Sequence, residues 1–305
     1  MLCPMLERKP MKTPLKKAAA RSAAKSVRPA TAKAVKAGAA KAAPAKGAAK
    51  KRAASASKGP AALMTLAEVM RILEQAGSEQ TRKTYARHGA NGPMFGVRFG
   101  DLFTLMKKID VDHALARELW ASGNVDARNL ALKIADPQEL TSKELDRWAI
   151  ENPMRMCGLY VATLAAESPH GRSKLREWLS SSDERLLAMG WTLLGRLSDL
   201  DPSFPEDELL RRIVEIEKTI HSAPNEVRSD MNRALIAIGG HSPAMRKAVV
   251  AAAKRIGTVK VDQGDTACKT ADAVATIEKM WARSGTRFPS PAAHERSMKS
   301  MRRRC

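Results

Sequence analysis

The 305-residue sequence is poor in aromatic residues, which make up 4% of it, and its first 62 residues contain no Phe, Trp or Tyr. That opening segment has one acidic residue, Glu7, against sixteen lysines and arginines. A segment with few apolar side chains and one sign of charge does not bury enough surface to offset the entropy lost on ordering. We therefore expect residues 1–62 to form a disordered basic arm rich in Lys, Ala and Pro.

Long apolar runs are also absent. The longest, residues 157–166, is about half of the ~20 residues that a membrane-spanning helix needs. No apolar stretch of the signal-peptide type follows Met1. The sequence predicts no membrane association and a location inside the cell, in the cytoplasm.

Motifs of familiar catalytic chemistry are missing as well. The four cysteines lie far apart and the six histidines are scattered singly, so no zinc ligand set is predicted. There is no P-loop, HExxH, GxSxG or GxGxxG sequence. Asp262, Asp265 and Cys268 lie close together, but we interpret their segment as a loop that precedes a helix. No metal and no cofactor are expected.

What the sequence does have is positive charge at its ends. The formal net charge is +21, and residues 1–62 and 285–305 carry nearly all of it, because residues 63–284 are close to neutral. We expect residues 285–305 to form a second basic tail. Flexible cationic segments bind polyanions by releasing condensed counterions, so double-stranded DNA is the expected partner and RNA is not excluded. An organelle transit peptide or a merely solubilising tail are the alternatives for the N-terminal arm.

Residues 63–284 have the apolar spacing of helices. Thr65 and Glu68 form a predicted capping box at the start of the first one. Further helices are predicted at about 78–88, 101–109, 112–122, 124–134, 142–151, 154–167, 171–180, 183–198, 206–221, 225–238, 243–256 and 268–283. No segment alternates as a strand does. The predicted fold is all-α.

The helices differ in how many of their sides are apolar. The one at 183–198 is apolar around most of its circumference, whereas the one at 206–221 has a single inward stripe. Two layers of unequal burial are typical of stacked helical pairs of the HEAT or armadillo kind, with an irregular bundle as the alternative. In the Gly-rich segment 92–103, we expect Gly92, Gly96 and Gly100 to shape the turn into the helix near Asp101.

Three segments of this body resemble a known family: YARHGANGPMFGVRFGDLFTLMKKI (85–109), LDRWAIEN (145–152) and SDERLLAMGWTLLGRLS (182–198). Together they resemble the DNA alkylation repair proteins of the AlkD type, which are built from HEAT-like helical repeats. The resemblance covers essentially all of 63–284 and implies a concave basic groove that receives duplex DNA. It also implies a cleft carboxylate, flanked by tryptophans and an arginine, that faces an alkylated purine.

Only one of the four cleft positions is retained. Trp148 matches the first tryptophan, but the carboxylate position is Asn152, the arginine position is Ala188 or Met189, and the second tryptophan falls near Ala237. An amide has no negative charge with which to stabilise a cationic transition state. Glu151 is the neighbouring acid, although on a helix it points about 100° away. Trp148 has two interpretations, a site residue and a core residue.

Candidate DNA-contacting cations lie on three predicted helices. They are Arg82, Lys83 and Arg87, then Lys107 and Lys108, and finally Arg246, Lys247, Lys254 and Arg255. The last four are expected to form a phosphate-facing stripe, and an ordinary solvated helix face is the alternative.

The leading functional prediction is a DNA-binding protein of the alkylation repair family, associated with the nucleoid and with at most weak excision of alkylated purines. One alternative is an active alkylpurine DNA glycosylase that uses Glu151. The other is a non-enzymatic scaffold that binds proteins on its concave face. The sequence leaves the oligomeric state open.

Overall fold

The computed structural model describes residues 64–285, 287–298 and 301–303. In this part of the chain the secondary structure is helical, apart from an isolated bridge between Gly77 and Val97. Among these residues no helix has the length and apolarity required to cross a membrane. The predicted arm, residues 1–62, lies outside the described residues.

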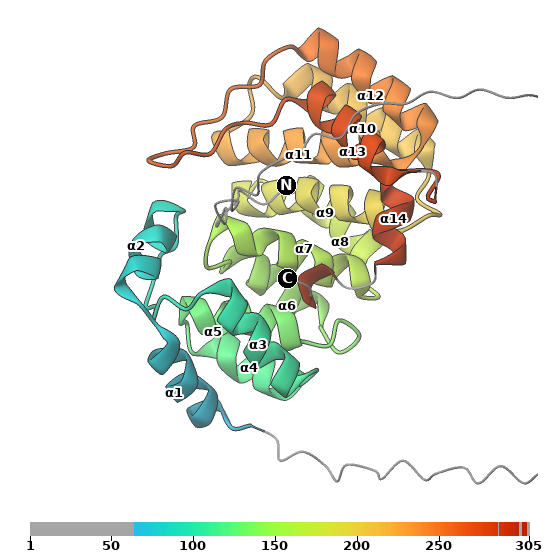
Figure 1. The fold of residues 1–305 in the computed structure, drawn as a ribbon. Coiled ribbons are helices and arrows are strands. Elements are labelled where there is room, and N and C mark those ends of the chain that lie inside the picture. Colours follow the sequence, from blue (N-terminus) through green and yellow to red (C-terminus); the bar gives the residue numbers. More distant parts are fainter. Residues whose placement is uncertain (1–63, 286, 299–300, 304–305) are drawn as a thin grey trace, which may run out of the picture. The chain divides into compact units, whose positions relative to one another are not determined.

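Most of the helices follow one another with short connections, and longer ones lie at residues 88–98 and 257–272 (Figure 1). They are α1 (Leu66–Ala76), α2 (Glu79–Arg87), α3 (Phe99–Ile109), α4 (His113–Ala121), α5 (Val125–Ile134), α6 (Ser142–Ile150), α7 (Arg155–Glu167), α8 (Gly171–Leu179), α9 (Glu184–Leu200), α10 (Glu206–Thr219), α11 (Asn225–His241), α12 (Pro243–Ile256), α13 (Ala273–Ser284), α14 (Pro291–Ser297) and the 3-10 helix η1 (Met301–Arg303). The predicted capping box of Thr65 and Glu68 is present at α1.

Helices α5, α7, α9, α11 and α13 pack side by side, and we call them the inner layer. Helices α4, α6, α8, α10 and α12 form the outer layer, so the prediction of stacked helical pairs is confirmed. As expected, α9 is covered on several sides, by α7, α8, α11 and α14. The apolar stripe of α10 that faces inward is narrower than predicted. Two of the helix's apolar side chains, Leu210 and Val214, are 45% and 49% exposed.

The Gly-rich segment wraps around a buried carboxylate, that of Asp126 on α5. Asp126 accepts hydrogen bonds from the backbone N–H groups of Phe95 (2.7 Å), Gly96 (2.9 Å) and Val97 (2.9 Å). Gly96 has a φ of +79°, and a Cβ there would lie 2.5 Å from the Ser78 carbonyl oxygen. Gly96 is therefore a turn residue, as predicted, because a larger residue does not fit.

Two sequence-based boundaries at the C-terminal end were wrong. Helix α13 begins at Ala273, with Asp272 as its N-cap, and not at 268. Residues 285–305 are not simply a tail, because their described part includes α14, which packs against α9, α11 and α13. Arg302, in η1, is only 2% exposed. The basic character of this segment concealed its apolar anchor, Pro291 and Ala292, both of which are buried.

Replacing Asp126 by Asn should destabilise the protein by about 3 kcal/mol, since one amide oxygen cannot accept the hydrogen bonds of three buried N–H groups. Urea unfolding of the two proteins measures the difference. Asp101→Asn is the matched control, because Asp101 is paired with Arg98 near the surface; it should change stability by about 1 kcal/mol or less. Equal effects of the two substitutions would contradict this role of Asp126.

His113 should make the protein less stable in mild acid. It is 5% exposed, neither ring nitrogen has a hydrogen-bond partner among the described residues, and burial together with the Arg117 charge lowers its pKa. The unfolded chain therefore takes up the proton first, and stability falls as pH drops below about 6.5. In His113→Leu, the loss of unfolding free energy between pH 7 and pH 5 should be smaller than in the wild type. The exposed His294→Leu change should leave that loss unaltered.

Candidate functional site

Trp148 lies at the end of α6 and is completely buried. Its indole ring stacks on that of Trp120 from α4, with ring centroids 4.3 Å apart and planes within 10°. The Trp148 Nε1 atom has no hydrogen-bond partner among the described residues. This geometry favours the core interpretation of Trp148, because a ligand reaches the ring only if Trp120 or its surroundings move.

Glu151, the C-cap of α6, is held by two donors. Its Oε2 accepts hydrogen bonds from Trp120 Nε1 (2.8 Å) and from Arg128 Nη2 (3.0 Å). The Arg128 guanidinium also lies 5.1 Å from the centroid of the Trp120 ring and donates to the Glu151 carbonyl oxygen (3.0 Å). The carboxylate therefore serves to tie α4, α5 and α6 together, and its charge is compensated by Arg128.

Asn152 follows directly and is partly buried. A Cβ added to Gly158 on α7 would lie 3.2 Å from Asn152 Nδ2 and 3.5 Å from Met189 Cε on α9, so Gly158 makes room for both side chains. The Asn152 Oδ1 atom is buried without a partner in the described part of the chain. Two of the positions that the resemblance places in a cleft, 152 and 189, thus meet at Gly158, while Ala237 on α11 packs near Gly195 of α9.

A polar cluster that was not predicted from the sequence lies on the inner layer. Arg155, the first residue of α7, donates from Nη2 to Ser229 Oγ on α11 (3.0 Å). The neighbouring Asp230 accepts from Arg233 (3.1 Å). Burial raises the pKa of Asp230 to about 6, against the opposing charges of Arg233 and Arg155.

No local motif marked this cluster, because Arg155 and Ser229 are 74 residues apart in the sequence. Only the contact between α7, α9 and α11 brings its members together. The Asp230 side chain is 19% exposed. The inner layer thus presents a partly accessible carboxylate with arginines beside it.

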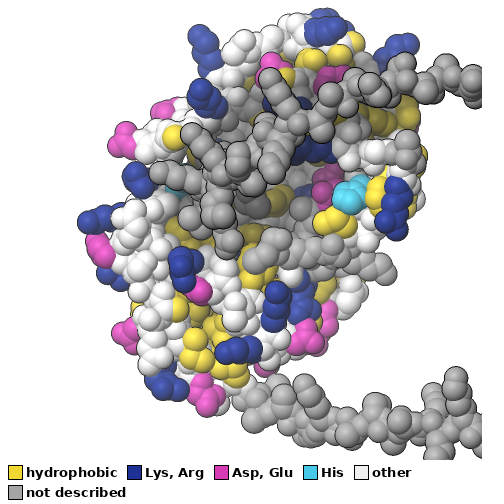
Figure 2. Space-filling model, in the orientation of Figure 1, with side chains coloured by type: hydrophobic (Ala, Val, Ile, Leu, Met, Phe, Trp, Pro, Cys, Tyr) yellow, Lys and Arg dark blue, Asp and Glu magenta, His cyan; other side chains and the backbone are white. Residues whose placement is uncertain are grey.

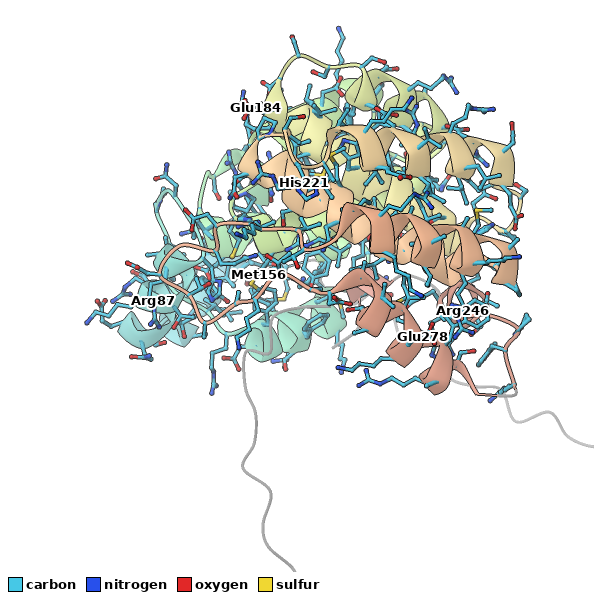
Figure 3. The ribbon with its side chains drawn as sticks, turned by 90° about the horizontal axis from the view of Figure 1, so that it is seen from above. Arg87, Met156, Glu184, His221, Arg246 and Glu278 are labelled. Carbon is cyan, nitrogen blue, oxygen red and sulfur yellow. The ribbon has the colours of Figure 1, made fainter. Side chains whose placement is uncertain are left out.

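The predicted cations at the N-terminal end of the body are only partly available. Arg82 pairs with Glu79 (2.6 Å) and donates to the Phe95 carbonyl oxygen (3.1 Å), and Lys83 lies 3.7 Å from the same Glu79. Arg87, Lys107 and Lys108 are exposed. Figure 3 shows Arg87 at the edge of the molecule, far from Arg246 on α12, so these residues and those of α12 do not form one patch.

The four cations of α12 do not form a single stripe either. Arg246 pairs with Glu278 of α13, beside which Figure 3 shows it, whereas Arg255 binds Glu217 of α10 (2.5 Å). Nine residues of helix separate the two arginines, which places them about 180° apart around the axis. Lys247 and Lys254 are exposed between them. The α12 arginines therefore connect α12 to its neighbours, and the two lysines face solvent.

Charges on the visible rim of the molecule are mixed. In the space-filling view, Lys and Arg side chains are dispersed around the edge and interspersed with Asp and Glu (Figure 2). Ion pairs between neighbouring helices contribute to this mixture, for example Arg117 with Glu144 (2.6 Å). The near neutrality of residues 63–284 in the sequence thus reflects charges that pair locally.

Comparison with known proteins agrees with this architecture. The chain is 26% identical over 223 residues to uncharacterized proteins of Listeria innocua and of Listeria monocytogenes, an overlap of 71% of this chain and 97% of each relative. A solved structure has a TM-score of 0.67 and 30% identity, covering 75% of this chain and 98% of its own. It is described as a new family of proteins related to the HEAT-like repeat DNA glycosylases, with affinity for branched DNA structures.

A protein-family model adds the decisive match. The model that describes DNA alkylation repair enzymes aligns with residues 69–266, which include helices α2 to α12 and every predicted site residue. The stacked helical pairs are thus those of a HEAT-like repeat fold. This chain belongs to the DNA alkylation repair enzyme family.

Proposed function

We propose that this protein binds double-stranded DNA, with a preference for branched structures, and that excision of alkylated purines is at most a weak activity. The observation that carries the proposal is the replacement of the cleft carboxylate by Asn152, next to a Glu151 whose charge is already paired. The affinity of the similar solved protein for branched DNA supports the choice of ligand.

The chemistry of base excision explains why Asn152 matters. When the glycosidic bond of an alkylpurine breaks, positive charge develops on the sugar, and an enzyme gains rate by placing negative charge beside it. The Asn152 amide is neutral. Glu151 would have to give up hydrogen bonds from Trp120 and Arg128 before it faced a nucleotide. Asn152 and Glu151 therefore provide no free negative charge for catalysis. We infer that this part of the protein recognises the shape of DNA and does not cleave the glycosidic bond efficiently.

The N-terminal arm supplies the affinity in this proposal. Its sixteen cations and single acid lie outside the neutral helical body. Each phosphate that such a segment neutralises releases counterions, which favours binding to any duplex and keeps the protein associated with the nucleoid. RNA offers the same phosphates, so selectivity for DNA is assigned to the helical body.

Deleting residues 1–62 should reduce the steepness of the salt dependence of binding. For a linear duplex, the slope of log K against log salt should become shallower by several units, since each phosphate contact contributes about 0.9. The preference for a four-way junction over a linear duplex of equal length should survive the deletion. An unchanged slope would refute the role of the arm, and an equal affinity for junction and duplex would refute the preference.

Excision can be tested with DNA that contains 7-methylguanine, by measuring release of the free base. The wild type should release little, and Asn152→Asp should increase release by about tenfold or more, because a charge then lies where the cation develops. The exposed Asn91→Asp serves as a matched control and should have no effect.

Glu151 is tested in the same assay. Glu151→Gln should lower the stability of the protein without abolishing any base release that the wild type shows, because the carboxylate's partners are Trp120 and Arg128. Efficient release by the wild type that Glu151→Gln eliminates would instead establish an active glycosylase that depends on Glu151.

A further inference from the structure

The C-terminal segment lies across the inner layer of helices. Helix α14 packs against α9, α11 and α13, and η1 packs against α5 and α7, so together they contact all five inner helices. Figure 1 shows both elements, in red, over this part of the body. The sequence placed these residues in a basic tail available to DNA, whereas their described part is docked on the protein itself.

Helix α14 is anchored by its first turn. Ser290 caps it by accepting a hydrogen bond from the Ala293 N–H (3.1 Å), and Pro291 and Ala292 are buried. Gly240 of α11 lies beneath them. A Cβ at Gly240 would lie 2.9 Å from Met280 Cε of α13 and 3.6 Å, an ordinary van der Waals distance, from the Pro291 Cβ, so Gly240 lies where α11, α13 and α14 meet.

The guanidinium group of Arg302 in η1 is buried in a pocket whose walls supply hydrogen-bond acceptors. Its Nη1 donates to the carbonyl oxygens of Leu132 and Lys133 (3.0 Å each), and its Nη2 donates to that of Ala135 (2.8 Å). Its Nε donates to the carboxylate of Glu167 at the end of α7 (3.1 Å). The side chain is 2% exposed.

The chemistry of this pocket selects a cation with several donors. The last carbonyl groups of a helix have no partner within the helix, and they carry the negative end of its dipole. The ends of α5 and α7 therefore present acceptors and a negative charge at one place. The planar fork of an arginine matches three carbonyls and a carboxylate, which the single ammonium group of a lysine does not.

The neighbouring Arg303 adds a second attachment, an ion pair with Asp110 at the end of α3. Arg302 and Arg303 thus bind carbonyl and carboxylate groups of the protein. In a DNA complex, phosphate groups could take the place of these partners. A duplex that approaches the inner layer competes for the same guanidinium groups and for the space that α14 and η1 fill.

We propose that the pocket at the ends of α5 and α7 is a guanidinium-binding latch, occupied by Arg302, which holds the C-terminal segment over the inner layer until DNA displaces it. This inference rests on the proposed function, because it concerns the regulation of DNA binding. Where only a fraction of molecules is open, the apparent Kd exceeds the intrinsic Kd by the inverse of that fraction.

The test uses the full chain and the change Arg302→Ala. This variant loses a positive charge, yet it should bind an undamaged linear duplex more tightly, by about tenfold if the latch is closed in nine molecules of ten. Arg304→Ala removes the same charge two residues later and should bind no more tightly than the wild type. Hydrogen–deuterium exchange of residues 288–298 and 301–303 should be slow in the free wild type and faster in its DNA complex and in free Arg302→Ala.

Two milder variants keep the test valid if Arg302→Ala folds poorly. Arg302→Lys retains the charge without the fork, and Glu167→Gln removes the acidic partner without touching the segment; both should tighten DNA binding. The latch is refuted if these variants bind like Arg304→Ala and exchange in the segment is unaffected by DNA. If neither the wild type nor any variant binds a duplex or junction, DNA binding itself is refuted, while the exchange of the free variants still reports on the pocket.

Discussion

The close approach of α9 to its neighbours is the constraint on which the rest of the molecule depends. A Cβ at Gly190 would lie 2.9 Å from the Leu179 nitrogen on α8, and one at Gly195 would lie 3.3 Å from the Ala237 Cβ on α11. Because α9 also contacts α7 and α14, these two glycines set the spacing of both layers and of the C-terminal segment that crosses them. Larger residues there would separate the layers, since packed interiors do not absorb added volume easily.

The same packing explains the role of the positions that the family resemblance places in a catalytic cleft. Met189 is 6% exposed and Trp148 is completely buried, while Ala237 packs near Gly195. In this chain these positions contribute mainly to contacts between helices, and Asn152 adds a neutral amide at the edge of α6. On the inner layer, a partly exposed carboxylate is instead that of Asp230 on α11, which pairs with Arg233 and lies near the charge of Arg155. A fold shared with repair enzymes therefore does not by itself imply their catalytic residues.

Most of the fold could be predicted from the sequence, because helix periodicity and caps are local signals. The capping box of Thr65 and Glu68 is one example, and the helix around Trp191, which is apolar around most of its circumference, is another. The contacts of the candidate site were harder to predict from the sequence. The resemblance located Asn152 and Trp148, but the pairing of Glu151 with Arg128 and the meeting of Arg155 with Ser229 depend on contacts between distant helices. The docking of Arg302, which the sequence placed in a basic tail, was missed for the same reason, because its partners are three carbonyl groups and the distant Glu167 carboxylate.

The stacked pair of Trp120 and Trp148 has an optical consequence. Two indole rings with centroids 4.3 Å apart and nearly parallel planes couple electronically, so the near-ultraviolet spectra of the pair should differ from those of two isolated indoles. The pair is held by the Glu151 carboxylate, which accepts a hydrogen bond from the Trp120 indole N–H. The protein thus contains an intrinsic chromophore where α4 and α6 of its outer layer meet, and small rearrangements there can be followed without any added label.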